Sequence, residues 1–276
     1  MSKASDQFEQ NLVQMINKYK GYTLPSLPDW MLHEGIVPNS KIISAEGIGS
    51  ISKDNKTDVI IHLENSAPIK ISAKLSNAHF FGNWYGHKRF IAELGNDAFI
   101  RMTKETTLWA NNWMKTAKAP FVGVSLCFGK RSGRTAQNFT DIFKHEDILT
   151  VVRGFGCGDS VANCMFVANS VKQDLDHFIK TLQPIKNETI HAATNSFKIA
   201  YRPINPLTEC SNRGKNVYTR FVPFKKCHQK MTITSASELF KIGNFQTVEP
   251  NLLTHNNILN NLEAEYNIVI PRKPKH

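Results

Sequence analysis

The stretch KTDVIIHLENSAPIKISAKL, residues 56–75, decides the fold that we expect for this chain. It holds two apolar runs in which polar side chains alternate, and the sequence ENSAP separates them. Since side chains alternate between the two faces of a strand, the pattern predicts an antiparallel hairpin. The start of its first strand then lies beside the end of its second. Asp58 and Lys74 are therefore expected to meet on one side of the sheet, at one strand end.

Segments with helical and strand-like patterns flank this hairpin. Apolar residues at helical spacing predict a helix over 6–20, and a strand is expected at 41–50. After the hairpin we expect one or two helices within 84–117 and a buried strand at 120–129. Further on, DILTVVRGFGCGDS, residues 147–160, predicts a strand that enters a glycine-rich turn. The last third is expected to alternate short strands with basic loops. This order predicts an α/β fold, with a mixed central sheet, flanking helices and a β-rich C-terminal part.

The charge of the chain is strongly positive. It carries 34 Lys and Arg against 23 Asp and Glu, a net charge of +11. Two basic clusters, at 101–134 and at 198–230, each contain a single acidic residue. Such clusters suit binding to nucleic-acid phosphates, although a solvated basic face gives the same pattern. No apolar run is long enough to span a membrane, and the N-terminal MSKASDQFEQ lacks the apolar core of a signal peptide. We therefore expect a cytoplasmic protein with no membrane partner.

An aspartate and a lysine gathered at one strand end are components of a metal-dependent phosphodiesterase. The carboxylate of Asp58 would bind a hard cation such as Mg²⁺. A bound cation activates water and neutralises charge on the phosphate. The Lys74 ammonium would orient that water or stabilise the developing anion. A solvated hairpin with an ordinary charged face is the alternative interpretation of the same spacing.

The hairpin resembles the core of the PD-(D/E)xK nucleases, and within them the type II restriction endonucleases. The signature of that superfamily is an Asp on one strand, followed by (D/E)xK on the next. Asp58 takes the place of the first Asp, and Lys74 takes that of the lysine. Thr57 stands in the place of the Pro, and Ser72 stands where the second acid usually lies. The resemblance therefore assigns Asp58, Ser72 and Lys74 as catalytic residues and leaves the second metal ligand to be found elsewhere.

Three acids are candidates for that second ligand: Glu9 in the first helix, Glu46 in the first strand and Glu93 after the hairpin. Glu9 is favoured, because Phe8 and Leu12 on either side of it imply that its helix packs on the sheet. Glu9 is therefore predicted to bind Mg²⁺ together with the aspartate of the hairpin.

The resemblance also implies a function for the whole chain. It implies a single nuclease domain over 1–276, with a catalytic core at about 5–130 and a DNA-recognition extension at about 131–276. The expected activity is Mg²⁺-dependent, sequence-specific hydrolysis of phosphodiester bonds in double-stranded DNA, by an endodeoxyribonuclease of a restriction system. A cognate methyltransferase is then expected as a genetic neighbour and not as a bound subunit. Monomer and homodimer stay open, as do two other functions: a non-catalytic DNA- or RNA-binding protein, and a structure-specific repair nuclease of the same superfamily.

Residues of the basic clusters, and of the segment after the hairpin, are expected to contact DNA. Arg and Asn side chains bind the edges of G and A through paired hydrogen bonds, while phosphate contacts fix the position of the protein on the duplex. The predicted DNA-binding residues are Lys88, Arg89, Lys130, Arg131, Arg134, Arg202, Asn212, Arg213, Lys215, Arg220, Lys225 and Lys226. A zinc site built from Cys210, Cys227 and His228 is left open, although its spacing matches no standard zinc module.

Overall fold

The fold is taken from a computed structural model, which describes residues 3–48, 55–82, 84–130, 133–194, 196–209, 216–251 and 253–273. The chain forms two compact units, and each unit is built from two segments. The first unit comprises Met1–Phe81 and Lys144–Phe197, and the second comprises Gly82–Phe143 and Lys198–His276. The expected division into a core at about 5–130 and an extension at about 131–276 does not coincide with these units. The chain leaves the first unit after the hairpin and returns to it later.

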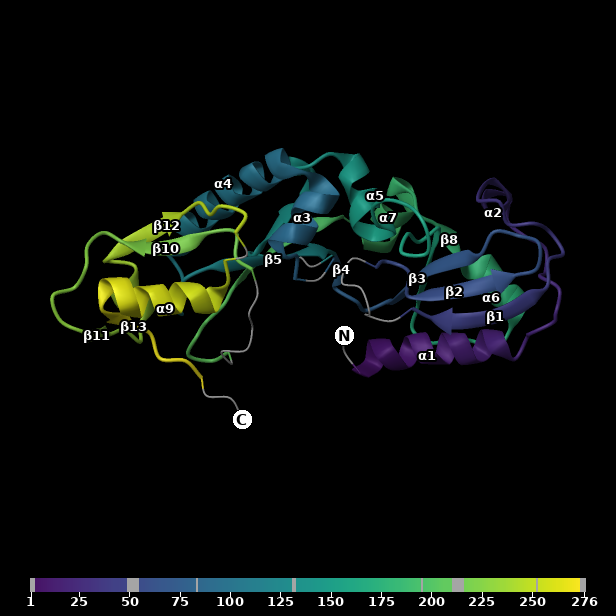
Figure 1. The fold of residues 1–276 in the computed structure, drawn as a ribbon, viewed down its shortest axis with the longest axis horizontal. Coiled ribbons are helices and arrows are strands. Elements are labelled where there is room, and N and C mark those ends of the chain that lie inside the picture. The colour runs from purple at the N-terminus through teal and green to yellow at the C-terminus, as the bar shows by residue number, and fades with distance from the viewer. Residues whose placement is uncertain are drawn as a thin grey trace. The chain divides into compact units, whose positions relative to one another are not determined.

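The first unit is built on a mixed five-stranded sheet in the order β1-β2-β3-β7-β8. Figure 1 shows β1, β2 and β3 side by side. Neighbouring strands pair antiparallel except β3 and β7, which run parallel. The expected hairpin is confirmed, because β2 and β3 pair antiparallel from Val59 opposite Ile71 to Ile61 opposite Ile69. The strands are β1 (Ile42–Gly47), β2 (Val59–Leu63), β3 (Ile69–Leu75), β7 (Cys164–Ala168) and β8 (Gln183–Pro184).

Helices pack on this sheet through buried apolar side chains. Helix α1 lies alongside β1 and β2 (Figure 1), and it buries the residues that the helical spacing predicted, Phe8 and Leu12 among them. The ring of Phe8 stacks on that of Phe166 of β7, with 5.6 Å between the ring centroids. The Phe166 ring in turn meets that of Phe178 of α6, with 5.2 Å between the centroids. These contacts join both helices and the sheet in one core. The helices of the first unit are α1 (Lys3–Asn17), α2 (Asp29–His33), α5 (His145–Arg153), α6 (Leu175–Thr181) and α7 (Asn187–Thr194).

The prediction of a strand at the start of 147–160 is wrong, because residues 145–153 form helix α5. Its β-branched residues suggested a strand, but Ile148, Val151 and Val152 are all buried at helical spacing. After the glycine-rich turn the chain enters β7, which pairs with β3. The order helix, strand, hairpin, helix, strand is therefore completed in the first unit by α5 and β7. The helices at 84–117 and the strand at 120–129 belong to the second unit instead.

The second unit packs helices against three small sheets. One sheet has the order β4-β5-β9-β6, and two further pairs are β10 with β12 and β11 with β13. One or two helices were expected within 84–117; the structure has two, and Gly95 separates them at a positive φ of 85°. The helices are α3 (His87–Leu94), α4 (Asn96–Trp113), a 3₁₀ turn (Phe139–Asp141), α8 (Ala236–Leu239) and α9 (His255–Tyr266). The strands are β5 (Val124–Gly129), β6 (Ala136–Asn138), β9 (Lys198–Pro203), β10 (Arg220–Pro223), β11 (Met231–Thr232), β12 (Gly243–Gln246), β13 (Ile268–Val269) and β4 (Phe80–Gly82), of which only Gly82 falls in the second unit.

The predicted class is confirmed: the chain has an α/β fold in which mixed sheets carry flanking helices. The C-terminal part contains the expected short strands, and it also contains the 12-residue helix α9, which was not predicted from the sequence. Among the described residues, no helix has both the length and the apolar character needed to cross a membrane.

Candidate functional site

Asp58 and Lys74 meet at one end of the β2–β3 hairpin. The Lys74 ammonium donates a hydrogen bond of 2.6 Å to Oδ2 of Asp58 and another of 2.9 Å to the carbonyl of Ala73. The amide of Ala73 donates to the same Oδ2 at 2.8 Å. Only 15% of the Asp58 side chain and 20% of the Lys74 side chain are exposed, so this ion pair is largely shielded from water. The expected meeting of the two side chains is confirmed.

The two residues are not a directly opposed pair. The regular β2–β3 ladder ends at Val59 opposite Ile71, and the amide of Asp58 already donates to the carbonyl of Ile71 at 2.8 Å. Beyond this point β3 continues without a ladder partner from β2, so the Asp58 carboxylate is free to accept the amide of Ala73. Lys74 meanwhile pairs with Val167 of β7, which fixes its backbone from the other side. Asp58 therefore reaches Lys74 diagonally, along the end of the strand.

Glu9 is the acid that lies beside this pair. The pKa of Glu9 is raised from 4.5 to about 7, chiefly by burial and next by the negative charge of Asp58, while the ammonium of Lys74 lowers it in part. Glu46 is instead an exposed acid whose Oε1 lies 2.8 Å from Nε2 of His62. Of the candidates within the first unit, Glu9 is therefore the one that shares the electrostatic environment of Asp58.

Glu93 belongs to a different cluster in the second unit. Its carboxylate accepts hydrogen bonds from the hydroxyl of Tyr85 at 2.6 Å and from Nε of Arg89 at 2.8 Å. Only 4% of its side chain is exposed. Glu93 and Arg89 thus neutralise each other inside the second unit, and burial strongly raises the pKa of the neighbouring Tyr85.

Ser72 lies on β3 between Ile71 and Ala73 and is 2% exposed. Such a hydroxyl lies inside the unit, so Ser72 occupies the place of the expected second acid without presenting an oxygen to solvent. Within the part of the chain that the structure describes, no group of three or more His, Cys, Asp or Glu side chains is placed to hold a metal ion. The site therefore offers two carboxylates, Asp58 and Glu9, and one ammonium.

The backbone just before Asp58 is held by residues that were not predicted as part of the site. Lys56 is buried, and its ammonium donates to the carbonyl of Val151 near the end of α5. Its amide donates to the carbonyl of Ser160 at 3.0 Å. Gly154 allows this contact, since it has a φ of 101° and a Cβ there would lie 3.1 Å from Cγ of Lys56. The glycine of the turn was the one available signal of this close approach.

The described residues that were predicted to bind DNA all belong to the second unit. The sequence divides in the same way: the first unit carries 13 Lys and Arg against 14 Asp and Glu, and the second carries 21 against 9. The net charge is therefore −1 for the first unit and +12 for the second. The excess positive charge of the whole chain resides in the second unit, whereas the Asp58–Lys74 pair resides in the first.

Individual basic side chains of the second unit differ in their surroundings. Lys88, Lys225 and Lys226 are exposed, and Lys130 is half-buried. Two arginines lie over aromatic rings: Arg134 over Trp113 at 5.2 Å and Arg202 over Trp84 at 5.0 Å, measured from the guanidinium carbon to the ring centroid. Arg131, Asn212, Arg213 and Lys215 lie outside the described residues, as does Cys210 of the zinc alternative. Of that alternative, Cys227 is half-buried and His228 is exposed.

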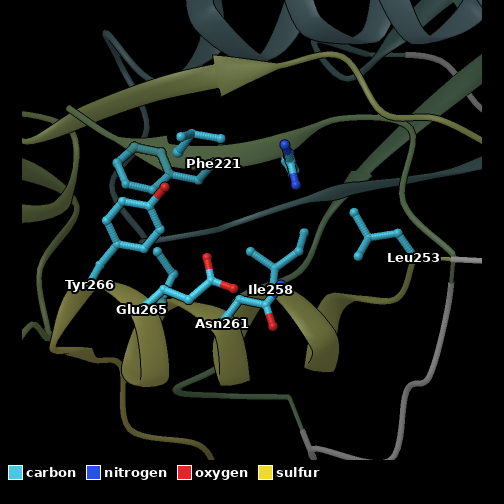
Figure 2. Close-up of a pocket in the computed structure, with 9 residues that line it drawn as sticks. Phe221, Leu253, Ile258, Asn261, Glu265 and Tyr266 are labelled. Atoms are coloured by element: carbon cyan, nitrogen blue, oxygen red, sulfur yellow. The ribbon is translucent and has the colours of Figure 1, made fainter. Parts of the chain in front are cut away.

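Arg220 lines a small pocket between β10 and α9. Figure 2 shows Glu265 and Asn261 of α9 projecting toward the strand that carries Phe221, with Tyr266 at one end and Leu253 at the other. The hollow has a volume of about 100 Å³, and its walls mix apolar side chains with one carboxylate and one guanidinium. A carboxylate in the wall disfavours a phosphate at this position, so Arg220 is less suited to a phosphate contact than the exposed lysines are.

The raised pKa of Glu9 predicts a pH-dependent effect on stability in the absence of metal. Because the carboxyl group has a pKa of about 7 in the folded state and 4.5 when unfolded, the folded state holds the proton more tightly. Wild-type stability should therefore fall as the pH rises between these values. Relative to wild type, Glu9→Gln should gain stability over that range and keep the gain above it. Thermal melts of both proteins in EDTA, across this pH range, measure the difference.

Glu64→Gln removes one exposed charge from the same hairpin and serves as the control. A melting-temperature difference between wild type and Glu9→Gln that does not change with pH would contradict the placement of Glu9 beside Asp58.

No protein-family model, no curated protein and no solved structure matches the chain. A function for this site therefore rests on the geometry of Asp58, Lys74 and Glu9 and on the charges of the two units.

Proposed function

We propose that the chain is a Mg²⁺-dependent endodeoxyribonuclease of the PD-(D/E)xK type, similar to type II restriction endonucleases. The observation that carries this proposal is the contact of 2.6 Å between Asp58 and Lys74 at the hairpin end, with the carboxyl group of Glu9 beside it. An aspartate and a lysine from adjacent strands are the pair that the resemblance requires. The order of elements supports it too, because α1, β1, the β2–β3 hairpin, α5 and β7 occur in this order within a single unit, with α2 after α1 and the inserted segment 82–143 before α5.

The charges of the site fit a divalent cation. Among the described residues, two carboxylates share the site with one ammonium, and the pKa of Glu9 is raised first by burial and second by the negative charge of Asp58. Mg²⁺ typically binds through one or two carboxylates together with water and phosphate oxygens, so a third protein ligand is not required. Asp58 and Glu9 would hold the ion. When bound there, it would supply an activated water and neutralise charge on the scissile phosphate.

Each residue of the site has a separate role in this proposal. Asp58 holds the Lys74 ammonium in place through their hydrogen bond, and the Ala73 amide fixes the orientation of that carboxylate. Lys74 presents a positive charge to the attacking water and to the anion that develops at phosphorus. Ser72 is buried, so it acts as a positioning residue in the centre of β3.

The second unit would bind the DNA in this scheme. Its net charge of +12 suits the phosphate backbone, and the counterions released on binding favour association at low salt. The same charge also favours the alternative of a protein that binds DNA or RNA without cutting it. The two functions differ in whether the Asp58–Lys74 pair has a chemical role.

Incubation of supercoiled plasmid with the protein and Mg²⁺ tests the proposal. Wild type should convert the plasmid to nicked and linear forms, and EDTA should prevent this. Asp58→Asn should abolish cleavage, because an amide binds Mg²⁺ poorly and leaves Lys74 without its counter-charge. The variant should still bind plasmid DNA, measured by gel shift in EDTA.

Glu64→Gln, an exposed acid on the turn of the same hairpin, is the matched control and should cleave as wild type does. If wild type binds but leaves the plasmid intact with Mg²⁺, the non-catalytic function is correct. Cleavage by Asp58→Asn at the wild-type rate would remove the metal-binding role from that residue. Discrete fragments from a linear substrate favour a restriction enzyme, whereas a preference for branched substrates favours a repair nuclease.

Lys74→Met should fold and bind DNA but cleave at least about a hundredfold more slowly at saturating Mg²⁺, because a thioether offers no charge to the nucleophile or the anion. Lys70→Met is the control on the same face of the same strand. The Lys70 ammonium donates to the carbonyl of Gly158 at 2.8 Å, away from Asp58, so its loss should cost far less activity. Single-turnover rates of the two variants decide between them, and an essential Lys70 with a dispensable Lys74 would refute the proposed site.

Salt dependence tests the role of the second unit. Replacing exposed Lys225 and Lys226 together by Ala should reduce the slope of log Kd against log salt concentration by about 2, since each neutralised phosphate releases close to one counterion. The matched control replaces two exposed lysines of the first unit, Lys41 and Lys186. Fluorescence anisotropy in EDTA measures both slopes. An unchanged slope for the first pair would place those lysines away from the DNA.

A further inference from the structure

Three aromatic rings and one guanidinium stack in series within the second unit. The centroid of the Trp109 ring lies 4.6 Å from that of the Tyr201 ring, and the angle between the two ring planes is 17°. Its centroid lies 5.3 Å from that of Trp113, with an interplanar angle of 13°. The guanidinium carbon of Arg134 lies 5.2 Å from the centroid of the Trp113 ring. The column therefore runs Tyr201, Trp109, Trp113, Arg134.

The backbone fixes the position of every member of this column. Trp109 and Trp113 are four residues apart on α4, which places them on one face of the helix. Tyr201 lies on β9, and its hydroxyl donates to Oε1 of Gln137 at 2.7 Å. The amide of Tyr201 donates to the carbonyl of Thr135 at 2.8 Å, which ties the residue after Arg134 to the same strand. The column is thus held at both ends by the sheet.

The two ends of the column differ in burial and in charge. Tyr201 is 1% exposed, and burial raises its pKa with help from the charges of Glu105 and Asp141. Trp113 is the last residue of α4 and is half-buried, while Arg134 is exposed. Packing of α4 on β9 accounts for the stacked Tyr201 and Trp109. That packing does not explain why a second tryptophan, Trp113, ends the helix with the guanidinium of Arg134 over its ring.

A planar guanidinium on an indole occupies the place that a nucleobase takes when it stacks. A cation over an aromatic ring at an exposed position is held only weakly, by about 0.5–1 kcal/mol, so another planar group can displace it. Stacking of a base on an aromatic side chain is stronger and works for every base, because each has a π face. The displaced arginine would then be close to the phosphate of the same nucleotide, for which its charge and planar donors are suited.

We propose that Trp113 is a stacking platform for an unpaired nucleobase, and that Arg134 covers this platform without ligand and binds the adjoining phosphate with ligand. The inference rests on the proposed function to the extent that the second unit binds nucleic acid. It adds a substrate class: DNA in which at least one base is unstacked, such as a single-stranded segment or a distorted duplex. A base in a regular duplex has both faces covered by its neighbours and cannot use the platform.

Two probes with the same phosphates separate stacking from charge. A short oligothymidylate and an abasic oligomer of the same length are titrated with wild type in EDTA, and anisotropy gives the two dissociation constants. Wild type should bind oligothymidylate on the order of tenfold to a hundredfold more tightly than the abasic oligomer. Oligothymidylate should also quench tryptophan fluorescence, and the abasic oligomer should not. Equal affinities for the two probes would overturn the proposal without any variant being made.

Variants then assign the effect to the column. Trp113→Leu should lose the preference for oligothymidylate, whereas Trp113→Phe should keep most of it because it keeps a π face. The salt slope should be unchanged in Trp113→Leu and should fall by about one in Arg134→Gln, because only the arginine neutralises a phosphate. Trp30→Leu, a half-buried tryptophan of α2 in the first unit, is the control and should bind as wild type does. A preference retained by Trp113→Leu refutes the assignment.

Failure of this inference differs from failure of the proposed function. If wild type cleaves plasmid with Mg²⁺ but binds the two oligomers equally, the nuclease stands and the platform does not. If oligothymidylate is preferred but no DNA is cut, the platform stands in a binding protein.

Discussion

The parallel pairing of β3 with β7 is the contact on which the first unit depends. It joins Leu75, the last residue of β3, to Ala168 in the other segment of that unit, across the whole of the inserted segment 82–143. Without it β3 would be an edge strand, and Lys74, which lies beyond the end of the β2–β3 ladder, would have no paired strand neighbour. With it, β3 is fixed between β2 and β7, and the ammonium of Lys74 is directed to Asp58. The geometry of the site thus follows from a long-range strand contact.

The electrostatics of the site depend on how little its charged side chains are exposed to water. A solvated pair of lysine and aspartate contributes little to stability, but this pair is mostly covered, and the aspartate also accepts a backbone amide. The pKa of the nearby Glu9 is raised by burial and by the charge of Asp58, and the ammonium of Lys74 offsets only part of that rise. A protein selected only for stability would gain by replacing Glu9 with a neutral residue. A carboxyl group with a raised pKa beside a second carboxylate is typical of sites of binding or chemistry.

Patterns among neighbouring residues predicted those helices and strands that form from their own local sequence. The β2–β3 hairpin and α1 follow from alternation and from helical spacing, so both the contact of Asp58 with Lys74 and the candidacy of Glu9 could be anticipated. Helix α5 was mistaken for a strand, because Ile148, Val151 and Val152 are β-branched while their spacing is helical. Strand β7 carries only a short apolar run, and nothing within that run reveals that its partner is β3. The division into two units could not be foreseen either, since it depends on which distant segments pair.

The alternation of segments between the two units has a consequence for synthesis on the ribosome. The chain emerges in order, so Met1–Phe81 must wait until the inserted segment and α5 have appeared before β7 can complete its sheet. During that interval the edge of β3 is unpaired, and an unpaired strand edge is prone to association with other chains. The second unit in turn waits for Lys198–His276. Neither unit corresponds to one continuous stretch of the chain, so a nascent or truncated chain passes through states in which both cores are incomplete.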